Sequence, residues 1–142
     1  MLATANAHKV EEIRGVFAPA GIEVLSLVEA GLNVLEPIED QPTFAGNAAL
    51  KARHYARAAH AVCLADDSGL CVDALDGAPG VRSARYAEVD GDRPTRDAAN
   101  NAKLVAALRD ISEADRTAHF VCVMVLADAE RTLAEATGQV DG

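Results

Sequence analysis

Two adjacent carboxylates, Asp66 and Asp67, are the residues of this sequence best suited to chemistry. They follow the apolar residues 61–65, the pattern of a strand buried on both faces, and precede Ser68-Gly69. Two carboxylates beside a core are costly unless a cation or hydrogen bonds stabilise them. Neighbouring strand residues point to opposite faces, so one aspartate could face a pocket while the other binds backbone amides or a lysine. In isolation, a turn or a cap explains these four residues at least as well.

A second group of polar residues could serve a metal ion and a polyphosphate. Glu39 lies between Pro37 and Pro42 and could be a second oxygen ligand for Mg²⁺, which takes one or two carboxylates plus substrate phosphates. Asn47 and Lys51 are one helical turn apart and could reach a polyphosphate together. On residue type alone, a solvated loop charge and a polar outer stripe of a helix explain these residues better.

Residues 4–9 join an expected strand to an expected helix. Backbone N–H groups, a hydroxyl, an amide and a lysine could bind an anion at that helix N-terminus. The residues are Thr4, Ala5, Asn6, Ala7, His8 and Lys9. The segment has no glycine and is therefore no Walker A loop, and a helix cap with an exposed charge is the simpler interpretation. Arg82 and Arg85 could add positive charge or form ion pairs.

The apolar pattern predicts the elements that must position these residues. In the first half of the chain it predicts the tail of a strand, a helix that closes at Pro19 and Gly21, a second strand, a loop, and a helix N-capped by Thr43. The strand tail is expected at residues 2–4, and the first helix has Val10, Ile13 and Phe17 on one face. The second strand is expected at residues 22–27, the loop at residues 29–42 and the second helix at residues 43–59.

The second half is expected to contain a strand that ends at the aspartates, another strand, a Gly/Pro turn, a helix capped by Thr95, and two final strands. The first two of these strands are expected at residues 61–65 and 70–75, and the turn at residues 76–80. The helix has Ala98, Ala102, Val105 and Leu108 on one side, and the final strands are expected at residues 117–126 and 132–140. Strands and helices interleave before a late antiparallel hairpin, so the expected class is α/β with a mixed central sheet flanked by helices. The length suits a single domain over residues 1–142.

The composition limits the classes of binding partner and indicates the cellular compartment. Thirteen Lys and Arg against 22 Asp and Glu give a formal charge of −9, which argues against binding nucleic acid or an anionic membrane. Three cysteines inside apolar runs suit buried thiols in a reducing compartment. There is no signal-peptide pattern at the N-terminus and no apolar run long enough to span a bilayer. We therefore expect a cytoplasmic protein.

Taken together, these segments resemble the Ham1/RdgB family, the inosine triphosphate pyrophosphatases. The resemblance is carried, in order, by residues 2–9, Glu39, and residues 43–52, 65–70, 77–86, 116–122 and 138–142. It implies hydrolysis of non-canonical purine nucleoside triphosphates (ITP, dITP and XTP) to the monophosphate and pyrophosphate, with Mg²⁺, in a homodimer. It also implies a role in keeping deaminated purines out of DNA and RNA.

The resemblance assigns roles to the candidate residues. Residues 4–9 would hold the phosphates, Glu39 and Asp67 would position the metal, and Ser68 would touch the substrate. Asp67 would also be the base that acts on water. This agrees with the residue types, because Mg²⁺ can neutralise phosphate charge while a carboxylate orients the attacking water. Attack at the α-phosphorus would expel pyrophosphate.

Two departures from the family pattern matter. Gly46 stands where the family usually has a Glu before Asn-Ala, which removes a carboxylate and weakens helix propensity. The family also continues past Gly142 into a Gly-Phe-Gly-Tyr-Asp-Pro segment, a Lys and a terminal Ser-His-Arg. The chain is therefore expected to lack a C-terminal segment that helps bind the base and phosphates, and a few N-terminal residues.

Two alternatives remain open at this point. The first is an inactive nucleotide-binding or dimerisation fragment of such an enzyme, which would bind triphosphate without turnover. The second is a pyrophosphatase of different base preference, such as a Maf-like enzyme. The intact Ala-Asp-Asp-Ser-Gly run of residues 65–69 argues against the second alternative.

Overall fold

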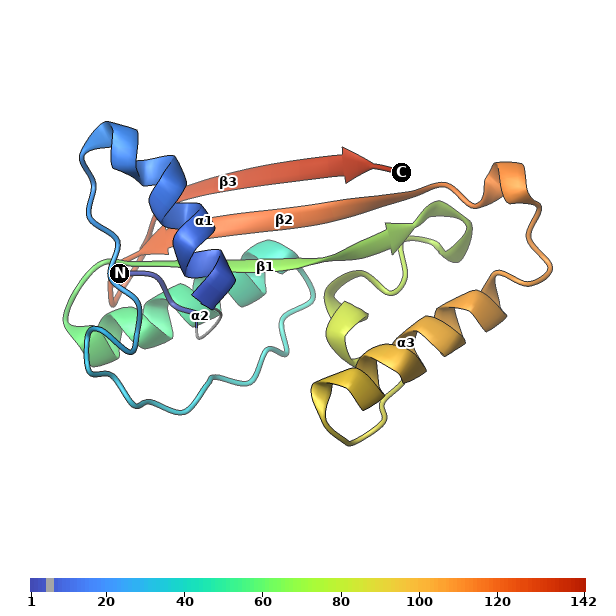
Figure 1. Ribbon diagram of the computed structural model, residues 1–142, viewed down its shortest axis with the longest axis horizontal. Helices are drawn as coiled ribbons and strands as arrows, with labels where there is room; N and C mark the ends of the chain where they lie inside the picture. Colours follow the sequence, from blue (N-terminus) through green and yellow to red (C-terminus); the bar gives the residue numbers. More distant parts are fainter. Residues whose placement is uncertain (5–6) are drawn as a thin grey trace. The chain divides into compact units, whose positions relative to one another are not determined.

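The computed structural model describes residues 1–4 and 7–142. In that part of the chain, helices and strands are joined by loops and short 3-10 segments (Figure 1). The regular elements are α1 (Ala7–Phe17), α2 (Phe44–Ala59), β1 (Cys63–Val72), α3 (Arg93–Ala107), β2 (Ala118–Ala127) and β3 (Thr132–Asp141). The strands form a sheet in the order β1-β2-β3, and consecutive strands run in opposite directions (Figure 1). The predicted α/β class and late hairpin are confirmed.

The described residues divide into two compact units. Unit 1 comprises Met1–Asp67 and Val123–Ala136, and unit 2 comprises Ser68–Cys122 and Thr137–Gly142. Each strand of the sheet therefore contributes residues to both units. The single domain predicted over residues 1–142 stays a prediction.

The core of unit 1 includes the N-terminal residues and α1. Leu2, Val10 and Val24 form a buried cluster. Leu2 also makes parallel bridges to Ser26 and to Leu64, which adds a parallel component to the antiparallel strands. Partly buried side chains from α1 and β1 pack against the cluster: Ile13, Phe17 and Leu64. The apolar face predicted for the first helix is confirmed.

The strand predicted over residues 22–27 is wrong, because only Ser26 in that segment takes part in a bridge. Side chains bind backbone groups that a strand ladder would need. Arg14 Nε donates to the carbonyl oxygen of Val24 at 2.9 Å, and the Ser26 N–H donates to Glu29 Oε2 at 2.8 Å. Such local side-chain bonds compete with regular secondary structure. The predicted tail of a strand at residues 2–4 is likewise reduced to the bridges of Leu2.

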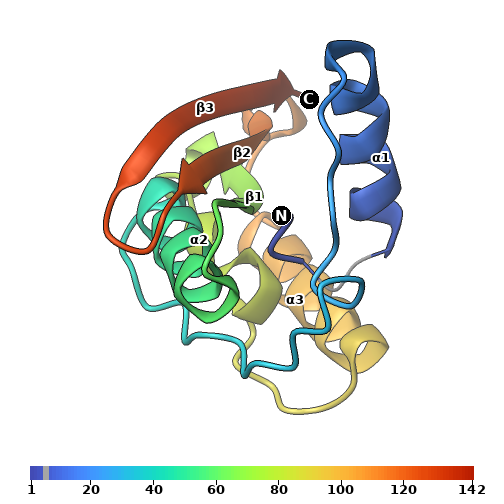
Figure 2. The same ribbon diagram turned by 90° about the vertical axis from the view of Figure 1, so that its left-hand side faces the viewer.

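The helix α2 begins where the sequence predicts it. Thr43 is the N-cap, and its Oγ1 accepts from the Gly46 N–H at 3.0 Å, which satisfies a donor at the helix start. The helix ends at Ala59 and is followed by His60 with a left-handed φ of 50°. Its buried face is rich in alanine, which permits close packing: Asn47, Ala48, Ala52, Tyr55 and Ala56. α2 is next to β1 in both views (Figure 1 and Figure 2).

β1 is one continuous strand, although the sequence predicts a break after residue 65 and a new strand at residue 70. The prediction treated Asp66, Asp67 and Ser68-Gly69 as a turn, because such residues usually interrupt strands. In the structure both carboxylates are bound by side chains from helices, so the strand continues through them. The two aspartates therefore lie in the middle of β1 and not at its end.

Unit 2 contains the 3-10 segments Asp73–Leu75 and Gly80–Arg85 as well as α3. The predicted cap Thr95 is wrong, because Asp92 is the N-cap and its Oδ1 accepts from the Thr95 N–H at 3.0 Å. Asp92 and Thr95 are both good capping residues, and Pro94 suits the first helical turn, which favours the earlier start.

The apolar side predicted for α3 is also wrong, because Ala98, Ala102 and Val105 are exposed. The buried residue of α3 is Asn100, whose Oδ1 accepts from the Ala87 N–H at 2.7 Å. The buried side chain of α3 is thus a polar one, bound to the backbone of Ala87, in place of the predicted apolar row. None of the described helices combines the length and apolar character needed to cross a membrane.

Candidate active site

The two adjacent aspartates of β1 are held by partners from different helices. Asp66 and Asp67 are each only 9% exposed. Lys9 Nζ, from α1, contacts Asp66 Oδ2, and Asn47 Nδ2, from α2, donates to Asp67 Oδ2 at 2.9 Å. The partners differ because neighbouring strand residues point to opposite faces. The prediction that one carboxylate would bind a lysine is confirmed for Asp66.

Asn47 lies behind Asp67 and is fully buried, with 0% of its surface exposed. Its Oδ1 accepts from the backbone N–H of Gln41 at 3.0 Å, while its Nδ2 donates to Asp67. Both ends of the amide are therefore bound within unit 1. The sequence pairs Asn47 with Lys51, but the structure gives the two residues different partners.

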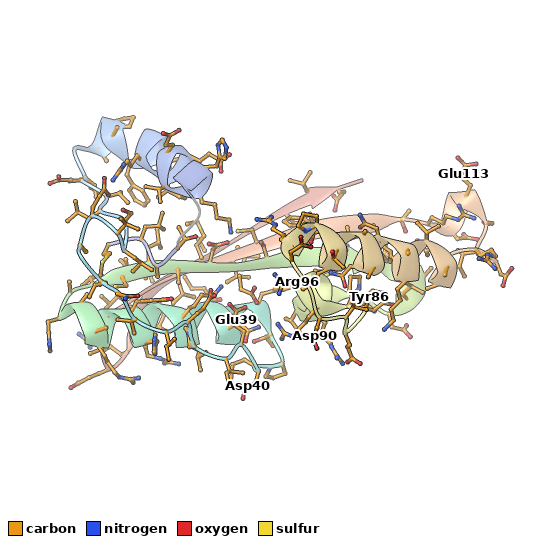
Figure 3. All side chains as sticks on the ribbon, turned by 60° about the horizontal axis from the view of Figure 1, so that its bottom comes forward. Glu39, Asp40, Tyr86, Asp90, Arg96 and Glu113 are labelled. Carbon is orange, nitrogen blue, oxygen red and sulfur yellow. The ribbon has the colours of Figure 1, made fainter. Side chains whose placement is uncertain are left out.

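Lys51 forms an ion pair with Glu39. Lys51 Nζ lies 2.9 Å from Glu39 Oε1, and the side chains are only 13% and 21% exposed. Figure 3 shows Glu39 on the loop that leads into α2. Glu39 is thus a half-buried charge anchored to the helix and not the freely solvated loop charge that its residue type suggests.

The carboxylates of this loop also affect Tyr55 of α2. Burial raises the pKa of the Tyr55 hydroxyl, and the negative charges of Glu36 and Glu39 raise this pKa further. A negative potential that disfavours a phenolate favours a cation. The cation that lies next to Glu39 is the Lys51 ammonium group, and no three His, Cys, Asp or Glu side chains of the described residues cluster as a metal site.

The structure describes part of the predicted phosphate-binding segment. α1 begins at Ala7, so residues 4–9 do lead into a helix N-terminus, as predicted. Thr4 is partly exposed, His8 is exposed, and Lys9 contacts Asp66. Two of the predicted residues, Ala5 and Asn6, lie outside the described residues, and for Ala7 only the backbone is described.

The remaining candidates belong to unit 2. Ser68 follows Asp67 in β1 and is partly exposed. Arg82 contacts Glu88, so the ion-pair alternative holds for this arginine. Arg85 ends the segment Gly80–Arg85 and is exposed.

Gln41 is a site residue that the sequence does not reveal. Its backbone N–H donates to Asn47. Nearly every residue type has a backbone N–H, so such a donor cannot be recognised from the residue type. The proline at position 42 and the N-cap Thr43 predict the start of a helix. They do not predict the hydrogen bond from the Gln41 N–H to Asn47.

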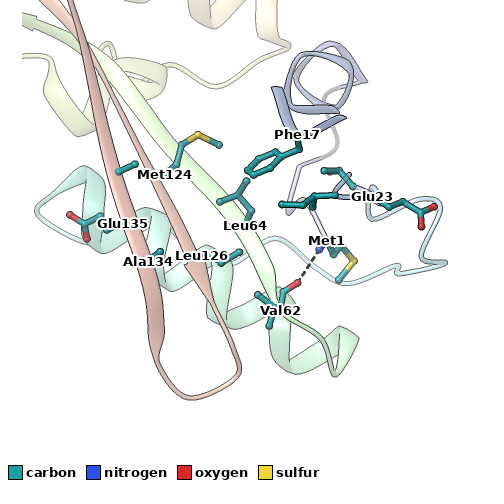
Figure 4. Close-up of a pocket in the computed structure, with 12 residues that line it drawn as sticks. Met1, Phe17, Glu23, Val62, Leu64, Met124, Leu126, Ala134 and Glu135 are labelled. Carbon is teal, nitrogen blue, oxygen red and sulfur yellow. Dashed lines mark hydrogen bonds between the residues drawn. The ribbon is translucent and has the colours of Figure 1, made fainter. Parts of the chain in front are cut away.

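Unit 1 also contains an apolar cavity of about 470 Å³. Phe17, Leu64, Met124 and Leu126 line it, and the Met1 amino group at its edge donates to the carbonyl oxygen of Val62 at 2.9 Å (Figure 4). The carboxylates Asp66, Asp67 and Glu39 do not line this cavity, and neither do Lys9, Asn47 and Lys51. The side chains that line it include no lysine, arginine or histidine, and the carboxylates of Glu23 and Glu135 at its wall would repel a phosphate.

The Ham1 family model matches residues 1–142, the whole chain. The chain belongs to the Ham1 family. A dITP/XTP pyrophosphatase of Ralstonia nicotianae is 50% identical over 125 residues, which cover 88% of this chain and 60% of that protein. The dITP/XTP pyrophosphatase of Burkholderia pseudomallei is 48% identical over 139 residues, covering 95% of this chain and 64% of that protein.

Solved structures of Ham1 proteins share the fold. A nucleoside-triphosphatase, dITP/XTP pyrophosphatase, of Mycobacterium abscessus superposes with a TM-score of 0.78 at 37% identity, covering 99% of this Ham1 chain and 70% of that chain. A HAM1 protein from Coxiella burnetii gives a TM-score of 0.81 at 35% identity, with coverages of 99% and 68%. The chain spans about three fifths of the length of the curated relatives that it matches first.

Proposed function

We propose that this chain takes part in the hydrolysis of non-canonical purine nucleoside triphosphates (ITP, dITP and XTP) to the monophosphate and pyrophosphate. The observation that carries the proposal is Asp67, a nearly buried carboxylate fixed by Asn47 in the middle of β1. The names of the relatives, dITP/XTP pyrophosphatases, supply the substrate class. Such an activity would remove deaminated purine nucleotides before they enter DNA or RNA.

Asp67 is the proposed base. Its carboxylate accepts a proton from a water molecule, whose oxygen attacks the α-phosphorus of the substrate. The bond from that phosphorus to the oxygen bridging the α- and β-phosphates breaks, and pyrophosphate leaves with the electron pair. A carboxylate whose orientation is fixed in advance loses little freedom in this step, which is how positioning accelerates a reaction.

Two lysines and the segment before α1 are proposed to hold the phosphates. Lys9 and Lys51 are kept near the carboxylates by their contacts with Asp66 and Glu39. Thr4, Ala5, Asn6, Ala7 and His8 would add backbone and side-chain donors at the start of α1. Ser68, directly after Asp67, would contact the substrate.

Glu39 and Asp67 are the proposed ligands of Mg²⁺. Carboxylate oxygens are hard donors of the kind this ion prefers. When bound, Mg²⁺ would supply charge neutralisation to the phosphate oxygens. Two carboxylates suffice for such a site because the substrate phosphates provide further ligands.

The proposed setting is a homodimer in the cytoplasm. Cys63, Cys71 and Cys122 form no disulfide in the described part of the chain, which suits a reducing compartment. The net charge of −9 disfavours nucleic acid and anionic membranes as partners.

Pyrophosphate release from dITP in the presence of Mg²⁺ tests the proposal. The assay compares this chain with its Asp67→Asn variant and uses ATP as the control substrate. We expect release that prefers dITP and falls at least about 100-fold in the variant, the usual contribution of a general base. Equal release from both chains, or a preference for ATP, would refute the assignment. Binding of dITP without any release would instead support the non-catalytic alternative.

A further inference from the structure

Asn47 is the most deeply buried polar side chain near the carboxylates. It has no exposed surface, whereas Asp66 and Asp67 each retain 9%. A side chain without exposed surface has no direct path to a solute. Its polar atoms must instead be satisfied inside the protein, and the two hydrogen bonds to Gln41 and Asp67 do this.

The chemistry of these two partners fixes the orientation of the Asn47 amide. The Gln41 backbone N–H can only donate, so it must face the Asn47 oxygen. An ionised carboxylate can only accept, so Asp67 must face the Asn47 nitrogen. A flipped amide would lose both hydrogen bonds. The backbone at Gln41 therefore determines which way Asn47 donates, and the Asn47 amide holds Oδ2 of Asp67.

Gly46 allows Gln41 to occupy this position. A Cβ atom at Gly46 would lie 2.8 Å from Gln41 Cβ and 3.1 Å from Thr43 Oγ1. A separation of 2.8 Å between carbon atoms is far inside van der Waals contact, and Cβ of Gln41 is attached directly to the backbone that donates to Asn47. With Gln41 at its present position, a Cβ at residue 46 therefore requires Gln41 or the start of α2 to shift.

We propose that Gly46, Gln41 and Asn47 form a positioning device that orients the Asp67 carboxylate, and that Asn47 is a positioning residue without substrate contact. The inference rests on the proposed function, because it is Asp67 as the base that gains from a fixed orientation. In this device, Gly46 leaves room for the loop at Gln41, and the Gln41 backbone holds the Asn47 amide.

Kinetics of Asn47 variants test the role of the amide. Asn47→Leu keeps a similar volume but removes both hydrogen bonds, and Asn47→Gln keeps the amide but displaces it by one methylene. We expect kcat for dITP to fall roughly 100-fold in both variants, the effect of a misplacement of about 1 Å, with KM and the dITP dissociation constant little changed. A rise in KM and in the dissociation constant at unchanged kcat would show substrate contact and overturn the proposal.

Gly46→Ala tests the spacer without touching Asn47 or Asp67, and Gly15→Ala is its matched control. Gly15 is the glycine of α1, where an added Cβ would meet no atom within 4 Å. NMR spectra of ¹⁵N-labelled chains report the Gln41 N–H and the Asn47 side-chain NH₂ directly. We expect Gly46→Ala to shift both signals and Gly15→Ala to shift neither.

The NMR result separates this inference from the proposed function. If the unmodified chain releases no pyrophosphate, the proposed function fails, but the signals of Gln41 and Asn47 still decide whether position 46 controls the amide. Unchanged signals in Gly46→Ala would overturn the positioning device whether or not the chain is active.

Discussion

Breaking the ion pair between Lys51 and Glu39 should destabilise the protein measurably. At the 2.9 Å between Nζ and Oε1, Coulomb attraction is about 1.4 kcal/mol in bulk water and roughly 6 kcal/mol at an effective dielectric constant of 20. Removing these charges from water offsets much of this attraction. With side chains 13% and 21% exposed, the pair lies between the surface and the interior. We therefore expect a coupling free energy of about 1–2 kcal/mol.

A double-mutant cycle with Lys51→Met and Glu39→Gln measures this coupling. Urea unfolding followed by circular dichroism gives the free energy of unfolding of each variant. The control cycle uses Arg93→Met and Asp97→Asn, which remove a pair separated by 3.6 Å with side chains 79% and 57% exposed. That surface pair should couple by about 0.5 kcal/mol or less. Equal coupling in the two cycles would refute the claim that partial burial strengthens the Lys51 pair.

Three further outcomes are expected. Thr43→Ala should lower the free energy of unfolding by about 1 kcal/mol, measured by urea unfolding, while Thr43→Ser should retain the cap. Burial raises the pKa of the Cys63 thiol, so its contribution to stability should be present below the ordinary thiol pKa and lost as the pH rises through the raised value. Cys63→Ala should flatten that alkaline loss in unfolding measured against pH. The apolar cavity should bind the dye ANS, and Ala134→Asp in its lining should reduce the fluorescence while Ala107→Asp on the exposed side of α3 should not.

The features that could be predicted from the sequence are those fixed by local interactions. The start of α2 depends on Thr43 and a backbone N–H three residues later, and both lie within one helical turn. The hairpin of β2 and β3 depends on a short polar turn between two strand-forming segments. Apolar spacing in α1 likewise reports one face of one helix. In each case the residues that decide the structure are neighbours in the sequence.

The features that could not be predicted depend on partners distant in the sequence. β1 continues through Asp66 and Asp67 because Lys9 and Asn47 bind them, 57 and 20 residues away. The segment around Val24 fails to become a strand because the Arg14 guanidinium binds its carbonyl. Neither contact can be inferred from the local secondary-structure propensity of the residues.

The candidate site shows the same division. Residue types and order pointed to Asp67 and Glu39, and to lysines near them, and the structure brings Lys9 to Asp66 and Lys51 to Glu39. The use of Asn47 as an internal amide could not be predicted, because its partner Gln41 acts through the backbone and has no characteristic side chain.

The position of β3 has a consequence for how this chain meets other chains. β3 lies at the edge of the described sheet, next to β2 only, and all ten of its residues are exposed. An edge strand offers unpaired N–H and C=O groups along one side, and this one contains neither lysine nor proline, two residues that commonly block strand addition. Any extended segment can add to such an edge through main-chain hydrogen bonds, largely independent of its sequence. High protein concentration would therefore favour self-association of the chain through this edge.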